Sequence, residues 1–473
     1  MSVDRAVVNR HADSLDGRAF TYRVPQGYPL VPGDLMLLRT VDGGQYLGQV
    51  REQEPVTSSE FGGTVGGFGS IIGAIGPEGA SLRPARTPFL RAGVEAASAA
   101  HLGALQAAAG ADLPVGRWRS GGVETSARLR AKGFNRHTFL CGQSGSGKTY
   151  ALGVLLEQLL IATELRMVVL DPNADFVRLG ETRPDAPDDA RRRLAPSEVR
   201  VLRAAAAGGE KLRMRFATMP RRAQAAVLEL DPVADRGEYN QFVHTMANLK
   251  SPNVKELIDD LIQGRADERA LAQRIENLGL GEWEVWAGEL ESAAEVVDGG
   301  ARATVLDLGG FGHPLEPLAV SLDLLENLWR QREARTPMLI VIDEAHNLCT
   351  AEPTSPLQAA VTERLIQIAA EGRKYGLWLL LSTQRPSKIH PQVLSQCDNL
   401  ALMRMNSRAD LAELSAMFGF VPPAMLQASQ SFAQGEVLIA GTFAPVPAVI
   451  QIGPRLTFEG GSDVSVPILT AQM

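Results

Sequence analysis

Residues 139–149 read Phe-Leu-Cys-Gly-Gln-Ser-Gly-Ser-Gly-Lys-Thr, and this stretch constrains the fold more than any other. It fits the pattern G-x-x-x-x-G-K-[S/T], with apolar residues before it that can end a strand and leucines at helical spacing after it. The glycines let the backbone turn sharply and point its N–H groups at phosphates. Glycine makes up 46 of the 473 residues, so a chance match is the alternative, but the strand and helix context argues against it. The stretch predicts a nucleoside triphosphate site.

This loop gives a chemical role to each of its residues. Lys148 reaches the β- and γ-phosphates, and the Thr149 hydroxyl joins a Mg²⁺ ion. The backbone that encloses the phosphates comes from Gly142, Gln143, Ser144, Gly145, Ser146 and Gly147. ATP and Mg²⁺ are therefore the expected cofactors.

A second motif is an aliphatic run, Met338-Leu-Ile-Val-Ile342, followed by two acids. Asp343 would hold the Mg²⁺ ion through its water shell, and Glu344 would take a proton from the water that attacks the γ-phosphate. The alternative is a buried strand whose final acids merely face solvent. His346 and Cys349 lie three residues apart, but no third ligand or partner is visible, so a structural role is favoured for both.

A third motif is the apolar run from Leu377 to Leu381, which ends in polar residues that include Gln384. In a parallel sheet the C-terminal ends of neighbouring strands face the same crevice, so Gln384 can reach the γ-phosphate or its water. Upstream, Ser355 could cap a helix that ends near the basic pair Arg373 and Lys374. This pair can serve a neighbour's phosphate; the alternative is a solvated helix end.

The chain changes character along its length. Short strand-like pieces separated by turn residues predict a small N-terminal β-barrel; they are Phe20–Val24, Asp34–Arg39, Tyr46–Val50 and Ser70–Ile75. An alanine-rich helix is expected over residues 96–109, and Leu113 to Trp118 as the passage to the next domain. From Arg136, strands alternate with helices, which predicts an α/β fold with a mostly parallel sheet. The stretch of about 183–300 carries charged helical segments without a strong strand, so it predicts a helical insertion in the sheet.

Composition limits the cellular setting and the partners. The net charge is −7, so any DNA contact needs a local basic surface. The three cysteines are too few and too scattered for a disulfide framework, and reduced thiols are expected. The N-terminus lacks a basic-then-apolar signal pattern, and the aliphatic runs are too short to span a bilayer, so we expect a cytoplasmic protein without membrane contact.

Several of these runs resemble the HerA family of DNA-translocating ATPases, relatives of FtsK. The resemblance rests on Arg136-His-Thr, the phosphate loop, Asp171-Pro-Asn-Ala-Asp175-Phe, Val341-Ile-Asp343-Glu-Ala-His346, Arg373-Lys-Tyr-Gly and, most specifically, Ser382-Thr-Gln-Arg-Pro-Ser-Lys388-Ile-His390-Pro. It spans nearly the whole chain. It implies a barrel like that of rotary ATP synthases over 1–115, a RecA-like ATPase domain over 116–455 with the insertion at about 183–300, and a tail over 456–473.

The same resemblance implies how such a protein works. It predicts a homohexamer with ATP at the subunit interfaces, double-stranded DNA through the pore, and an arginine supplied in trans, for which Arg373 and Arg136 match. It also implies a partner, either a NurA-like nuclease in DNA repair or a sirtuin-like or other effector in antiviral defence. Archaeal members usually carry His-Gly-Glu-Tyr where this chain has Asn173-Ala-Asp175-Phe176, which leaves a catalytic role of Asp175 open.

Two other interpretations compete with a DNA-pumping ATPase. Asp343-Glu-Ala-His346 spells the box of a helicase class with two motor domains, but the 130 residues after Asp343 are too few for a second motor. The other is an ATP-regulated hexameric scaffold that controls an effector without processive pumping. If DNA is bound, basic residues of the insertion are the candidates for its phosphates: Lys211, Arg213, Arg215, Arg221, Arg222, Lys250 and Lys255.

Overall fold

The computed structural model describes residues 10–56, 63–76, 79–82, 86–248, 261–264 and 266–461. The chain forms two compact units. Unit 1 comprises Met1–Thr163 and Trp378–Pro454, and unit 2 comprises Glu164–Leu377 and Arg455–Met473. Each unit therefore contains segments that are far apart in the sequence.

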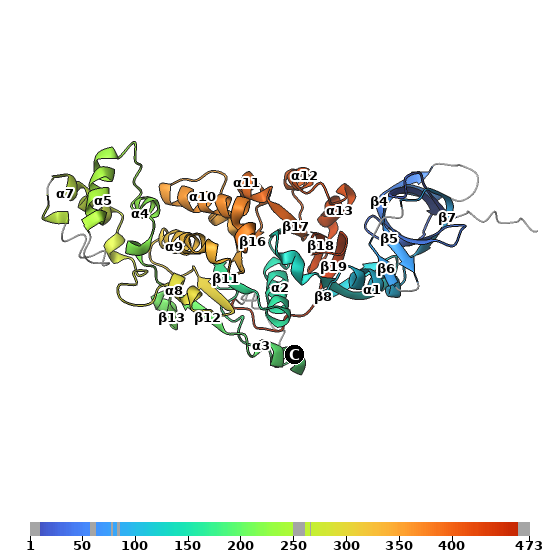
Figure 1. Cartoon of the computed structure of the whole chain (residues 1–473), viewed down its shortest axis with the longest axis horizontal. Helices are drawn as coiled ribbons and strands as arrows, with labels where there is room; N and C mark the ends of the chain where they lie inside the picture. Colours follow the sequence, from blue (N-terminus) through green and yellow to red (C-terminus); the bar gives the residue numbers. More distant parts are fainter. Residues whose placement is uncertain are drawn as a thin grey trace, which may run out of the picture. The chain divides into compact units, whose positions relative to one another are not determined.

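The N-terminal part of unit 1 is a closed β-barrel (Figure 1). Its strands run in the order β2-β1-β7-β3-β4-β5, and pairing of β2 with β5 closes the barrel. Alternate residues of β2 point inward, so Phe20, Tyr22 and Val24 are buried. A Cβ atom on Gly69 would lie 2.1 Å from the Phe20 ring, so this position of β5 requires glycine. The predicted barrel is confirmed, with the bounds β1 His11–Ser14, β2 Ala19–Pro25, β3 Leu35–Arg39, β4 Gln45–Val56, β5 Thr64–Gly76, β6 Gly79–Ser81 and β7 Phe89–Ala96.

The rest of unit 1 is a mixed sheet in the order β16-β10-β17-β18-β19-β8-β9. β10 lies between β16 and β17 and pairs with both in parallel, as the sequence predicts. Leu113–Ser120 is strand β8 and not merely a passage between domains, because its alternate residues are buried and it pairs with β9 and β19. The elements are α1 Ala99–Ala108, β8, β9 Val123–Leu129, β10 His137–Cys141, α2 Lys148–Ala162, β16 Leu377–Thr383, α11 Pro391–Leu394, β17 Cys397–Leu402, α12 Arg408–Met417, α13 Pro423–Ala428, β18 Glu436–Gly441 and β19 Ala448–Ile452.

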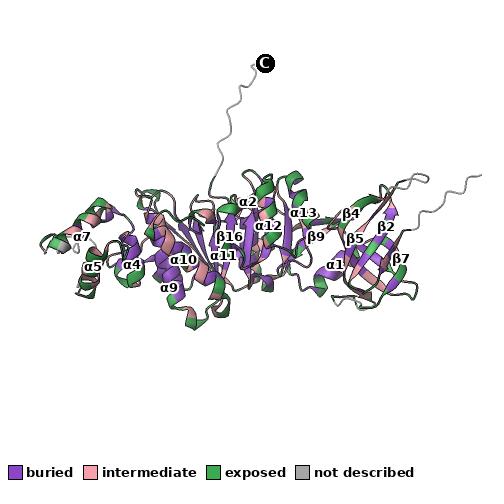
Figure 2. Ribbon diagram, turned by 90° about the horizontal axis from the view of Figure 1, so that it is seen from above, coloured by how far each residue is buried: buried purple, intermediate pink, exposed green. Residues whose placement is uncertain are grey.

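Unit 2 contains a second group of strands, in the order β13-β12-β14-β11-β15. β11, β14 and β15 are almost completely buried, and helices α9 and α10 pack against each other (Figure 2). Ser355 caps α10 as predicted, because its hydroxyl accepts the Gln358 N–H. The elements are β11 Arg166–Asp171, α3 Asp188–Leu194, β12 Val199–Arg203, β13 Glu210–Lys211, α4 Arg221–Val227, α5 Arg236–Asn248, α7 Ala266–Asn277, α8 Ala293–Asp298, β14 Ala303–Asp307, α9 Glu316–Arg330, β15 Met338–Ile342 and α10 Pro356–Glu371.

The expected helical insertion is confirmed, since helices α4, α5, α7 and α8 all lie within residues 183–300. Figure 2 shows α5 and α7 with much of their surface exposed. The stretch was expected to contain no strong strand, and here the structure differs. Val199–Arg203 forms β12, which pairs in parallel with β14. Its two arginines hide the apolar pattern of a five-residue strand. The predicted helical segment Asn253 to Ile262 lies largely outside the described residues.

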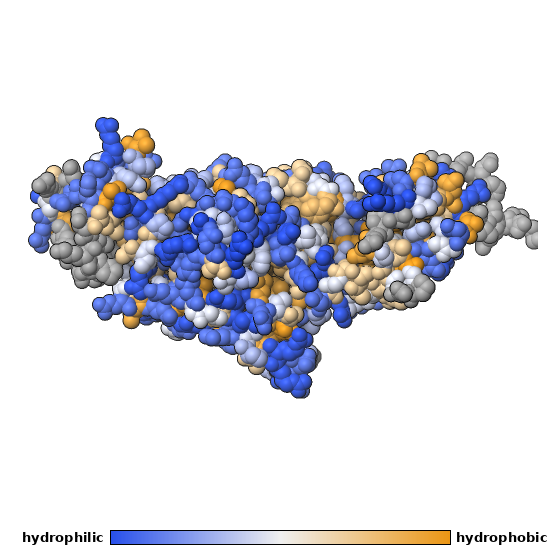
Figure 3. All heavy atoms as spheres, viewed as in Figure 1, coloured by the Kyte–Doolittle hydropathy of each residue, from blue (hydrophilic) through white to orange (hydrophobic). Residues whose placement is uncertain are grey.

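The surface agrees with the composition. Over α9 and α10 the face seen in Figure 3 is predominantly hydrophilic, while single hydrophobic side chains such as Leu15 and Val41 are exposed on the barrel. Cys141, Cys349 and Cys397 are buried free thiols. Within the described ranges, none of the helices combines the length and apolar character that a bilayer crossing requires.

Asp323 in α9 makes the stability of the fold depend on pH. Burial raises the pKa of its carboxyl to about 7, against a backbone hydrogen bond from Arg215 and the charge of Arg330 that lower it. Between pH ~4 and ~7 the folded chain therefore holds a proton that the unfolded chain has lost. The free energy of unfolding then falls as the pH rises through this window.

We expect Asp323→Asn to weaken this pH dependence. Between about pH 5 and pH 8, the wild type should lose up to a few kcal/mol more stability than the variant. Thermal unfolding followed by differential scanning fluorimetry at several pH values measures the difference, with Glu289→Gln on the surface as control. Unfolding midpoints that change in parallel in the wild type and Asp323→Asn would contradict the assignment.

Candidate nucleotide-binding site

The phosphate loop lies in unit 1, between the buried strand β10 and helix α2. Gly145 and Gly147 have φ angles of 75° and 96°, in the left-handed region that glycine adopts without strain. The loop is tied to both neighbouring strands. The Gly142 N–H donates to the Thr383 carbonyl at 3.3 Å, and the Gln143 N–H donates to the Arg404 carbonyl at 2.9 Å. The loop therefore sits at the N-terminus of α2, where helix N–H groups favour an anion.

Lys148 is 7% exposed and its ammonium points toward the end of β16. Its Nζ donates to the Ser382 hydroxyl at 3.1 Å. Cys141 of β10 pairs with Thr383 of β16, so Gln384, the next residue, follows the strand beside the loop. The structure thus brings Gln384 and Lys148 to the same edge of the unit 1 sheet. Ser382 was not predicted as a partner of Lys148, although it lies in the run that carries the family resemblance.

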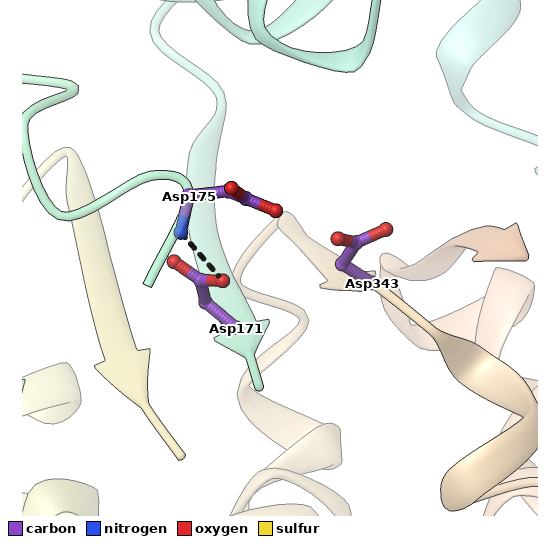
Figure 4. A group of neighbouring side chains, drawn as sticks. All are labelled: Asp171, Asp175 and Asp343. Atoms are coloured by element: carbon purple, nitrogen blue, oxygen red, sulfur yellow. Dashed lines mark hydrogen bonds between the residues drawn. The ribbon is translucent and has the colours of Figure 1, made fainter. Parts of the chain in front are cut away.

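In unit 2, Asp343 follows the buried strand β15 and is 2% exposed. Its N–H donates to the Leu170 carbonyl at 3.0 Å, so the end of β15 is fixed against β11. Asp171, Asp175 and Asp343 offer carboxylate oxygens that all lie within 4.8 Å of one another (Figure 4). From the sequence, a catalytic role of Asp175 stayed open and no role was predicted for Asp171. Asp171 ends β11, and Asp343 follows the neighbouring strand β15. Their positions at adjoining strand ends are the signal that could have indicated that these acids lie together.

Asp171 anchors the turn that brings Asp175 to Asp343. Its carboxylate accepts N–H groups from Asn173, Asp175 and Phe176 at 3.3, 3.1 and 2.8 Å. Burial, together with the negative charges of Asp175 and Asp343, nevertheless raises the pKa of Asp171 to about 7. Carboxylate oxygens are the ligands that Mg²⁺ prefers, so the donor chemistry around Asp343 fits a divalent cation.

Glu344 has an unusual backbone and a close neighbour. Its φ and ψ are 43° and 48°, in the left-handed region, and it begins the short turn Ala345–Asn347. The His346 Nδ1 lies 3.3 Å from Glu344 Oε2, and the two side chains are only 14% and 13% exposed. Cys349 is buried beyond this turn. The structure therefore places His346 beside Glu344, a contact that was not predicted from the sequence.

The two candidate arginines do not lie at the loop end of their strands. Arg136 comes just before β10, whereas the phosphate loop follows it. Its guanidinium forms an ion pair with Asp398 at 3.4 Å and donates to the Asn135 carbonyl. Arg373 is exposed in the turn Gly372–Tyr375, which leads into the N-terminal end of β16. Each arginine therefore lies at the opposite end of its strand from the predicted phosphate-binding residues.

Comparison with known proteins agrees with these motifs. Residues 113–279 match the family described as helicase HerA, central domain. The DNA double-strand break repair helicase HerA of Sulfurisphaera tokodaii is 23% identical over 371 residues, which cover 72% of this chain and 70% of that protein. HerA of Sulfolobus acidocaldarius is 30% identical over 136 residues, which cover 29% of this chain and 26% of that protein.

The probable HerA helicase of Methanocaldococcus jannaschii is 28% identical over 130 residues, so the matched stretch spans a quarter of that relative's length. Among solved structures, VirB4 of Thermoanaerobacter pseudethanolicus aligns with a TM-score of 0.51 and 16% identity, covering 73% of this chain and 97% of that chain. This structural likeness supports the predicted α/β fold. The phosphate loop, the acids at the end of β15 and these matches together show that the chain is similar to helicases of the HerA family.

Proposed function

We propose that this protein hydrolyses ATP to move double-stranded DNA through a ring of its own copies. The observation that carries the proposal is the complete phosphate loop, whose Lys148 ammonium lies buried against Ser382 at the shared end of β10 and β16. Relatives named as DNA repair helicases support the link to DNA.

In this proposal each predicted residue has one task. The backbone of Gly142–Gly147 and the Lys148 ammonium bind the phosphates, and Gln384 senses the γ-phosphate. Thr149 and Asp343 hold Mg²⁺, which when bound neutralises charge that develops on the phosphates. Glu344 takes a proton from the attacking water.

The position of Arg136 supports action on a neighbouring subunit. β10 has five residues, so it separates Arg136 from the loop of the same chain by roughly 16 Å. This separation is too large for the Arg136 guanidinium to reach phosphates at its own loop. An arginine that acts in trans requires an oligomer, and the HerA resemblance favours a homohexamer.

A partner protein completes the proposal. By resemblance, the ring works with a NurA-like nuclease in DNA end repair or with a sirtuin-like or other effector in antiviral defence. The second candidate function is the ATP-regulated scaffold, in which the ring assembles and controls such an effector without pumping DNA. The net charge of −7 favours this alternative, because a negative chain repels DNA at long range.

The structure reduces the set of basic residues available to DNA. Arg215 is bound to Glu295 and to the Gly288 carbonyl, and Arg222 is paired with Glu363. Lys250 and Lys255 lie outside the described residues. Across the described part of the chain, no ion pair engages the three others: Lys211, Arg213 and Arg221. We propose these three as contacts to DNA phosphates.

We expect duplex binding with little sequence preference and with a binding constant that falls steeply as salt is added. Each phosphate contact contributes a slope of about −0.9 when the logarithm of the binding constant is plotted against that of the salt concentration. Replacing Lys211, Arg213 and Arg221 with alanine should weaken binding and flatten this slope. Fluorescence anisotropy with a labelled duplex measures both effects.

Arg222→Ala is the matched control for that experiment, because Arg222 is adjacent to Arg221 but paired with Glu363. Its salt slope should equal that of the wild type. Weak binding that is insensitive to salt, from an assembled ring, would favour the scaffold.

A further inference from the structure

Glu344 has a backbone φ angle of 43°, in the left-handed region. A residue with a Cβ atom in the left-handed region is strained, and such strain persists only where the surrounding structure imposes it. Among the described residues, five others besides glycine have positive φ: Arg86, Arg91, Ala174, Glu229 and Arg335. Of all six, only Glu344 is a predicted catalytic residue, so its conformation needs a local explanation.

Hydrogen bonds around the following turn supply that explanation. The Asn347 N–H donates to the Glu344 carbonyl at 2.9 Å, which closes the turn. The Thr362 hydroxyl of α10 donates to the Leu348 carbonyl at 3.2 Å, and Gln358 of the same helix donates to the Asn347 carbonyl. α10 therefore holds the turn and, with it, the left-handed conformation of Glu344.

This conformation places the Glu344 carboxylate beside the imidazole ring of His346. His346 Nδ1 lies 3.3 Å from Glu344 Oε2, and both side chains are largely buried. A general base works best when a third group fixes its orientation. Catalytic contacts of this length commonly tighten when substrate binds.

We propose that His346 is a positioning residue for Glu344. With its proton on Nδ1, the imidazole donates to Glu344 Oε2 and leaves Oε1 to take the proton of the attacking water. His346 itself neither gains nor loses a proton, and it does not touch the nucleotide. The inference rests on the proposed role of Glu344 as general base.

Substitution of His346 tests the proposal through kcat. His346→Ala should lower kcat for ATP hydrolysis by about 10–100-fold, because a base displaced by about an ångström loses that much rate. The KM for ATP and the affinity for a slowly hydrolysed ATP analogue should stay unchanged. His346→Asn should recover most of the activity, because its amide N–H can occupy the position of Nδ1. His101→Ala, which removes a histidine that caps α1, is the control for loss of an imidazole elsewhere.

A double-mutant cycle with Glu344→Gln separates positioning from a structural role. If His346 acts only through Glu344, His346→Ala should cause almost no further loss in the Glu344→Gln background. Equal losses in both backgrounds, or an Asn variant as slow as the Ala variant, would overturn the inference. Unfolding temperatures of all variants show whether lost activity reflects lost folding.

The outcome also distinguishes this inference from the function on which it rests. If Glu344→Gln hydrolyses ATP normally, Glu344 is not the base, and both proposals about it fail. If Glu344→Gln is slow while His346→Ala has the wild-type kcat, only the role of His346 is wrong.

Discussion

Arg136→Ala or Arg373→Ala is expected to slow ATP hydrolysis by about 10³–10⁵-fold, the range measured for arginine fingers, while ATP binding survives. An arginine supplied by a neighbour stabilises charge that develops only in the transition state, so its loss affects kcat and leaves ground-state binding intact. Steady-state hydrolysis and equilibrium binding of a labelled nucleotide measure the two quantities. Arg191→Ala, which removes an exposed arginine paired with Asp188, is the control.

Mixing subunits tests whether the arginine acts in trans. Rings that combine Arg136→Ala with Lys148→Ala contain some interfaces where an intact loop faces an intact arginine. Partial recovery of hydrolysis is therefore expected at intermediate mixing ratios. If rings that are shown to be mixed recover nothing at any ratio, the arginine does not act across the interface.

Glu344→Gln is expected to bind ATP normally and to hydrolyse it about 10²–10⁴-fold more slowly, the usual contribution of a positioned general base. Glutamine keeps the size of the side chain but cannot accept the water proton. Lys148→Ala should instead lose nucleotide binding, because it removes the ammonium that meets the phosphates. Binding measured with a fluorescent ATP analogue, alongside turnover, distinguishes these two defects.

Wild-type turnover in Glu344→Gln would remove Glu344 from its role. Arg191→Ala serves again as a control, because its exposed side chain is paired with Asp188 in α3. Its turnover should equal that of the wild type.

Much of the fold could be predicted because local patterns and burial agree. The alternation in β2 and the continuous apolar runs of β15 and β16 each match the structure. Strands β12 and β8 are among those that were not predicted. β12 is five residues long with two arginines, and β8 contains a proline and a glycine, so only pairing with neighbours reveals them as strands. Such pairing is a tertiary property that a local pattern does not contain.

At the site, too, the residue types follow from local sequence patterns, whereas the contacts between the residues depend on the fold. Motif spacing alone predicts Lys148, Asp343 and Glu344 as site residues. The contact of Lys148 with Ser382 depends on the parallel register of β10 and β16. The contact of Glu344 with His346 depends on a left-handed residue, which side-chain spacing does not indicate.

The raised pKa of Asp171 could not be predicted either. It follows from the burial of β11 and from two other acids that the fold brings close to it.

ATP-driven displacement of a third strand from a triplex tests the central claim most directly. The wild-type ring should travel along the duplex and strip the third strand only when ATP is hydrolysed, and Glu344→Gln should bind the same DNA without stripping it. The rate of displacement should follow the DNA-stimulated rate of ATP hydrolysis as the ATP concentration is varied. A ring that binds duplex and hydrolyses ATP but never displaces the third strand would contradict translocation and leave the regulated scaffold.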